Sequence, residues 1–124
     1  MCQVVRMNIG DRQIRVADIK KKYIQNIIDA AKKCDLIDRV VLFGSSLEER
    51  CNEMSDMDLA VFGNQSPARA LTSKKYEAFS RQISSFDQYS QVYDILYFRS
   101  GAVNKSPIIE EIKKGEILYA KDLQ

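Results

Sequence analysis

Three aspartates and a glycine–serine pair are the residues whose types and spacing in this sequence suit chemistry. Gly44-Ser45 follows an apolar run, Asp56-x-Asp58 opens the next one, and Asp94 lies near the start of a third. Neighbouring carboxylates repel one another, which raises the pKa of at least one of them unless a cation lies nearby. Oxygen-only ligands favour hard cations such as Mg²⁺, and two such ions can hold the attacking and leaving oxygens of a phosphoryl displacement. The pattern predicts metal-assisted phosphoryl chemistry.

The glycine–serine pair suits the phosphate side of such a reaction. Gly44 has no side chain, so its backbone can approach a phosphate closely. If Ser45 begins a short helix, its free N–H groups favour the polyphosphate of an NTP, and its hydroxyl adds a donor. We therefore expect Gly44 and Ser45 to bind the phosphates of a nucleotide.

Each of these features has a simpler interpretation when taken alone. A glycine–serine pair is commonly a turn, Asp-x-Asp is commonly a solvated strand entry, and Asp94 could be a hydrogen-bonded buried polar group. Their joint occurrence, in this order and on matching elements, favours a site. An acid within the apolar run 92–98 is also costly to bury without a partner.

Three short apolar runs, 38–43, 56–62 and 91–98, predict the strands that position these residues. The first two are joined by a short link and are expected to be antiparallel neighbours, whereas the link to the third contains a helix and permits a parallel crossover. Side chains two residues apart share one face of a strand. The three carboxylates and the glycine–serine pair are therefore expected at one end of one sheet.

Helices are predicted between the strands. An amphipathic helix starts at Ala17 with lysines on its polar face, a second follows the Ser66-Pro67 start signal and continues to Phe86, and a short third follows Ser106-Pro107. A final strand is expected at 117–119. Together these elements predict an α/β (α+β) fold: a small mixed β-sheet with flanking helices in a single domain of 17–124. Residues 1–16 are interpreted as an N-terminal extension, a hairpin turning at Gly10-Asp11.

Composition narrows the class of protein. The 124 residues suffice for one domain, and the absence of histidine excludes imidazole catalysis and histidine-bearing zinc sites. Cys2, Cys34 and Cys51 form no C-x-x-C pair, which favours reduced thiols in the cytoplasm over a disulfide framework. The net charge of +2 gives no reason to expect direct nucleic-acid binding, and no apolar run predicts a signal peptide or a membrane span. Cys51 is interpreted as a structural thiol.

The sequence resembles a known family. Phe43-Gly44-Ser45, ten residues, then Asp56-Met57-Asp58-Leu59 match the G-S…D-x-D signature of the DNA polymerase beta-like nucleotidyltransferase superfamily. The short length, the helix before the motif and the segment 112–119 resemble its minimal nucleotidyltransferases, over about 17–123.

The resemblance implies an activity. Many of these minimal enzymes are antitoxins that attach AMP from ATP to a tyrosine of a HEPN-domain ribonuclease toxin. It implies that Gly44 and Ser45 bind the nucleotide phosphates, and that Asp56, Asp58 and Asp94 ligate two Mg²⁺ ions. Asp94 would also help to activate the acceptor hydroxyl.

One position departs from the family, and other functions stay open. Many relatives have arginine three positions after the serine, where this chain has Glu48; Arg50 is the nearest substitute. Two alternatives are an enzyme with a small aminoglycoside-type acceptor and a non-catalytic module that neutralises a partner by binding. The sequence leaves the acceptor, the base preference and homo-oligomerisation open.

Overall fold

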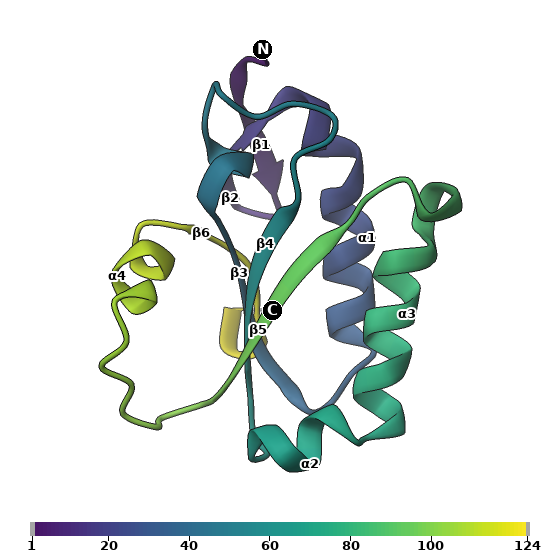
Figure 1. Cartoon of the computed structure of the whole chain (residues 1–124), viewed down its shortest axis with the longest axis vertical. Helices are drawn as coiled ribbons and strands as arrows, with labels where there is room; N and C mark the ends of the chain where they lie inside the picture. Colours follow the sequence, from purple (N-terminus) through teal and green to yellow (C-terminus); the bar gives the residue numbers. More distant parts are fainter. Residues whose placement is uncertain (1, 124) are drawn as a thin grey trace.

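A four-stranded mixed sheet forms the centre of the protein, as seen in a computed structural model that describes residues 2–123 (Figure 1). The strand order is β5-β4-β3-β6. β4 is antiparallel to β3 and parallel to β5, as the sequence predicts, and β6 is antiparallel to β3. The bounds are β3 (Ile37–Phe43), β4 (Met57–Gly63), β5 (Tyr93–Arg99) and β6 (Glu116–Ala120).

Two helices cover one face of this sheet. α1 (Lys21–Lys32) and α3 (Lys74–Tyr89) lie side by side, and their apolar stripes pack against Val40, Leu59 and Val61 in the main core (Figure 1). The short helix α4 (Ile108–Lys113) lies on the other side, where Ile112 packs against Val41 and Ala60. This second face is only partly covered, because α4 contacts β3 and leaves β4 and β5 more open. The predicted mixed α/β fold with flanking helices in one small domain is confirmed.

The N-terminal segment is a hairpin that belongs to the same core. β1 (Val4–Ile9) and β2 (Arg12–Ala17) pair antiparallel around Gly10, which has a φ of +55°. Ile14 is buried in the main core, and the Arg12 guanidinium donates to the Ile117 carbonyl of β6 at 3.0 Å. The hairpin therefore packs as part of the domain. Residue 1 of the predicted N-terminal extension and residue 124 of the predicted domain lie outside the described residues.

The helices begin or end at other residues than predicted. The predicted second helix is two helices, α2 (Pro67–Leu71) and α3, because the Ser73 hydroxyl caps a new start, and the helical backbone ends before Phe86, which has an extended conformation. α4 begins one residue late, with Pro107 at its N-cap. Three-residue or four-residue 3₁₀ turns complete the chain: η1 (Asp18–Lys20), η2 (Gly44–Leu47) and η3 (Lys121–Leu123). No helix within 2–123 is long and apolar enough to cross a membrane.

Candidate active site at one end of the sheet

Asp58 and Asp94 are direct neighbours on two parallel strands. The register of β4 and β5 pairs these two residues. Paired residues on adjacent strands point to the same face, and the strands are about 4.8 Å apart. Asp58 is half-buried and Asp94 is exposed, so neither carboxylate points into a dry apolar interior. The structure brings together the two acids that the sequence places on separate strands.

Gly44 lies against the Asp58 carboxylate. Its neighbour Phe43, the last residue of β3, is paired with Asp58 across the antiparallel ladder. A Cβ added at Gly44 would lie 2.3 Å from Asp58 Oδ2, so a larger residue does not fit there, and the φ of +79° also favours glycine. Gly44 therefore lies in close contact with the Asp58 carboxylate, and its binding to a phosphate stays a prediction.

Asp56 lies outside the strands that carry the other two acids. β4 starts at Met57, so Asp56 ends the preceding loop instead of opening the strand, and its side chain is exposed. Within 2–123, no group of three or more histidine, cysteine, aspartate or glutamate side chains is arranged to hold a metal ion. The described residues therefore show no preformed site with three carboxylate ligands.

The electrostatics of the site converge on Asp58. Burial raises the pKa of the Asp58 carboxyl above its ordinary value, and the charges of Asp94 and Asp56 raise it further. Arg50 opposes them and lowers the pKa of Asp58. Asp58 thus lies at the centre of the acidic cluster, where a divalent cation would relieve the most repulsion.

The segment after β3 is a short 3₁₀ helix, η2, that begins at Gly44, one residue before the short helix considered from the sequence. Ser45 lies half-buried in η2, next to Gly44. Three residues further on, Glu48 forms an ion pair with Arg50, and both side chains are largely exposed. Arg50, the cation nearest to this turn in the sequence, is therefore already paired with the Glu48 carboxylate.

Lys20 is a residue of the site region that the sequence interpretation missed. The sequence places it among the lysines at the start of the first predicted helix, where a solvent-exposed side chain is expected, yet it is 1% exposed. Its ammonium group donates to the carbonyls of Ser55 at 2.7 Å and Glu53 at 3.3 Å, and to the Gln91 amide oxygen at 2.7 Å. The Gln91 amide nitrogen in turn donates to the carbonyls of Ser55 at 3.0 Å and Val92 at 2.7 Å.

These hydrogen bonds tie together the backbone that leads into all three aspartates. Ser55 directly precedes Asp56, and Val92 lies two residues before Asp94. The Val92 carbonyl also accepts from Met57 N–H at 3.1 Å. Lys20 and Gln91 thus form a buried brace under the site. The only sequence signal was Lys20 at the edge of an apolar helix stripe, which is too common to indicate such a role.

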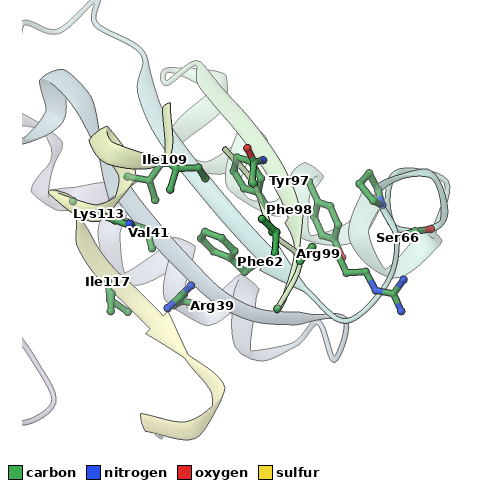
Figure 2. A pocket seen from close by; sticks show the side chains of 17 residues that line it. Arg39, Val41, Phe62, Ser66, Tyr97, Phe98, Arg99, Ile109, Lys113 and Ile117 are labelled. Carbon is green, nitrogen blue, oxygen red and sulfur yellow. The ribbon is translucent and has the colours of Figure 1, made fainter. Parts of the chain in front are cut away.

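Figure 2 shows an apolar cleft lined by Phe62 and Phe98. By the strand register these two residues share a sheet face with Asp58 and Asp94 and lie toward the other end of the strands. Phe62 and Phe98, a registered pair, stack with their centroids 5.3 Å apart, and the Arg39 guanidinium lies 4.4 Å from the Phe62 centroid. The cleft has a volume of about 790 Å³. Its lining includes the cations Arg39, Arg99 and Lys113 and contains no acidic residue.

The carboxylate oxygens of the site partly meet the needs of a hard cation. Asp58 and Asp94 offer carboxylate oxygens from fixed strand positions on one face, and oxygen donors are those that Mg²⁺ prefers. The third predicted donor, Asp56, lies on the loop before β4. Cys51 takes no part: it is fully buried beside Cys2 and Ala17, and burial raises the pKa of its thiol, as expected of a structural cysteine.

Comparison with known proteins adds a family assignment to this geometry. Residues 25–124 match the family described as Polymerase beta, Nucleotidyltransferase. The matched segment contains the glycine–serine turn, all three aspartates and the cleft, and it leaves out the hairpin and the first turn of α1. No curated protein shows significant similarity to the chain.

Proposed function

Because the chain belongs to the polymerase beta nucleotidyltransferase family, we propose that it transfers a nucleoside monophosphate from an NTP to an acceptor hydroxyl group. One observation carries the proposal: the registered pair Asp58 and Asp94 lies beside Gly44, whose missing side chain lets the turn after β3 pack directly against the Asp58 carboxylate. Acidic pairs next to a glycine turn suit a polyphosphate that is bound together with cations. The nucleotide in this proposal is ATP.

In the proposed complex, Asp56, Asp58 and Asp94 hold two Mg²⁺ ions, which supply positive charge against the polyphosphate. Gly44 and Ser45 bind the phosphates through backbone N–H groups and the Ser45 hydroxyl. Asp94, which is exposed, orients the acceptor hydroxyl and accepts its proton.

The reaction is a substitution at the α-phosphorus. The acceptor oxygen forms a bond to that phosphorus, the bond to the bridging oxygen breaks, and pyrophosphate leaves with the electron pair. The chain contributes positioning and electrostatics and forms no covalent intermediate of its own.

The acceptor that we propose is a tyrosine of a HEPN-domain ribonuclease toxin, which makes the protein an antitoxin. Two features support this. The segment from the glycine–serine turn to 112–119 resembles minimal nucleotidyltransferases of that kind. The exposed Asp94 also lies on the sheet face that α4 covers only in part, so a tyrosine of a second protein can reach it from solvent.

The test is incubation with Mg²⁺ and α-labelled ATP, with and without the product of the neighbouring gene. We expect label on a tyrosine of the partner, and none with Asp58→Asn or Asp94→Asn. The matched control is Asp29→Asn, an exposed aspartate on α1 outside the site. Tight binding of the partner with no label from any NTP would show a non-catalytic module, and label on an aminoglycoside alone would show a small-molecule enzyme.

A further inference from the structure

We infer that the acceptor is an extended polypeptide segment that adds as a strand to the free edge of β5. The inference rests on the proposed function, which determines where the acceptor must enter. The observations that carry it are the order of the site residues across the sheet, the unprotected edge of β5 and the cleft at its far end.

The order of residues across the sheet gives the direction of approach. Gly44 directly follows β3, Asp58 lies on β4 and Asp94 lies on β5, in that spatial order. In an in-line substitution the leaving group and the attacking oxygen lie on opposite sides of the phosphorus. With the polyphosphate at Gly44 and the α-phosphorus near Asp58, the acceptor oxygen approaches from the side of Asp94, over the outermost strand.

The outer edge of β5 is open for pairing. Val92 accepts from Met57 N–H at 3.1 Å and Ser100 donates to the Gly63 carbonyl at 2.8 Å, so the even-numbered residues bond to β4. The odd-numbered residues, among them Ile95 and Tyr97, therefore direct their backbone N–H and C=O groups outward. Within 2–123, β4 is the only strand that pairs with β5.

This edge lacks the features that usually prevent strand addition. Proteins commonly protect edge strands with a bulge, a proline or an inner charge. The β4–β5 register runs without a shift from Tyr93 to Arg99, and the strand has no proline. Its charges are Asp94, which belongs to the site, and Arg99 at the far end.

The cleft around Phe98, which Figure 2 shows, provides a second contact for the added strand at a fixed distance from Asp94. Asp94 and Phe98 share a sheet face four residues apart, about 13 Å along the strand. A residue of an added strand in register with Asp94 stands beside that carboxylate, and the residue four positions away on the same face stands beside Phe98. The acceptor segment therefore carries its tyrosine four residues from an apolar side chain that enters the cleft.

Charge complementarity further specifies the segment. The cleft presents Arg39 and Arg99, together with Lys113, which forms an ion pair with Glu110 at 3.6 Å, and its lining residues include no acid. An acidic residue next to the apolar one would pair with these cations. The partner that fits is thus an extended segment with tyrosine, a four-residue step to an apolar residue, and a neighbouring acid.

The experiment uses the full chain with Mg²⁺, ATP and three synthetic peptides. The first has one tyrosine, a leucine four residues away and a glutamate beside the leucine. The second has serine for leucine, and the third has the first sequence with alternate backbone amides N-methylated, which blocks strand pairing. Binding is measured by calorimetry and by hydrogen exchange of the β5 amides, and transfer is measured by label from ATP.

We expect the first peptide to bind at least tenfold more tightly than the other two and to protect the amides of Ile95 and Tyr97. Arg99→Glu should weaken this binding, whereas Arg69→Glu, an exposed arginine on α2, should not. Equal binding of the N-methylated peptide, protection of other amides, or no binding of any peptide would overturn the inference. Concentration-dependent protection of Ile95 in the free protein would assign the edge to a second copy and also overturn it.

These outcomes separate the two proposals. Label transferred equally to the N-methylated peptide would leave the transferase in place and remove strand addition. Strand-specific protection with no label on any acceptor would instead contradict the transferase.

Discussion

Gly44 and Asp58 lie in such close contact that a single added carbon atom at Gly44 would overlap the Asp58 carboxylate. The distance from that carbon to Asp58 Oδ2 would be 2.3 Å, far below van der Waals contact. The contact joins the end of β3 to the start of β4, so the turn and the central carboxylate of the site cannot change independently. The geometry of the site thus depends on the absence of a side chain.

Gly44→Ala should therefore damage both the stability and the activity. The added methyl group displaces Asp58, and the positive φ adds backbone strain, so we expect a loss of about 1–3 kcal/mol in the free energy of unfolding. Transfer should fall more than tenfold. Gly10→Ala is the matched control, because Gly10 also has a positive φ but has nothing within 4 Å of its added carbon. Equal effects of the two variants on kcat/KM, with urea unfolding measured in parallel, would contradict this prediction.

Asp58→Asn should have opposite effects on stability and on activity. In the folded, metal-free protein, burial and the negative charges of Asp94 and Asp56 all disfavour the ionised form of Asp58. Neutralising it should stabilise the metal-free protein at pH 7 by on the order of 1 kcal/mol, or about 4 °C in Tm. Transfer should be lost. Thermal denaturation in EDTA checks the first part, and a lowered Tm would show that Asp58 has a structural partner.

Protons should compete with metal ions at a higher pH than for an ordinary aspartate. The folded-state pKa of Asp58 is raised, so the folded protein holds a proton there at pH values where the unfolded chain has lost it. The metal-free protein therefore loses stability as the pH rises through this window. Metal affinity should change the opposite way and fall by up to about tenfold per pH unit below the raised pKa.

Calorimetric titration with Mn²⁺ over a pH series tests this prediction. The decline in affinity should start above the ordinary aspartate pKa of 3.8. In Asp58→Asn, the remaining weak binding should decline only at lower pH. An identical pH profile in the variant would mean that another carboxylate controls metal binding.

The sequence predicts the parts of the fold that depend on periodicity and link length. The runs 38–43 and 56–62 are joined by a short link, and the structure makes them antiparallel β3 and β4. The helix-bearing link before Asp94 gives the parallel strand, and with it the pairing to Asp58. These relationships follow from local pattern and chain length, which a single sequence contains.

Features that depend on three-dimensional surroundings were not predicted. Lys20 looks like its exposed neighbours Lys21 and Lys22, and only the folded chain surrounds its ammonium group with three acceptors. The helix break before Phe86 likewise depends on where α3 must end for β5 to begin. The side-chain direction of Asp56 likewise does not follow from the sequence, because a loop residue lies outside the two-residue alternation of a strand.

Lys20→Met should reveal the buried brace as a positioning device. Methionine fills a similar volume but leaves the Glu53 carbonyl and the Gln91 amide oxygen without this donor, at a cost of about 1–3 kcal/mol. Because the Ser55 carbonyl also loses its ammonium partner, the backbone before Asp56 loosens. We expect Mn²⁺ affinity, measured by calorimetry, to fall about tenfold. KM for the acceptor should change little.

The control for the brace is Lys21→Met, the exposed neighbour on α1. A second variant, Gln91→Glu, keeps an acceptor for the ammonium group and should retain folding. If Lys20→Met unfolds the protein, the metal affinity of Gln91→Glu still measures the role of the brace, through its lost hydrogen bonds to Ser55 and Val92. Unchanged Mn²⁺ affinity in a folded Lys20→Met would limit Lys20 to a structural role.

Glu48→Gln should strengthen nucleotide binding. In the structure Glu48 holds the Arg50 guanidinium in an ion pair, and it adds a negative charge three residues from Ser45, where the polyphosphate is proposed to bind. An exposed pair of this kind contributes at most about 1 kcal/mol to stability, so its removal should leave folding intact. The released arginine can then turn toward the phosphates, and we expect KM for ATP to fall about threefold to tenfold while kcat changes less. The double variant Glu48→Gln, Arg50→Gln should lose this gain. A gain that persists without Arg50 would show that removing the negative charge suffices, and no gain in either variant would place the triphosphate away from the η2 turn.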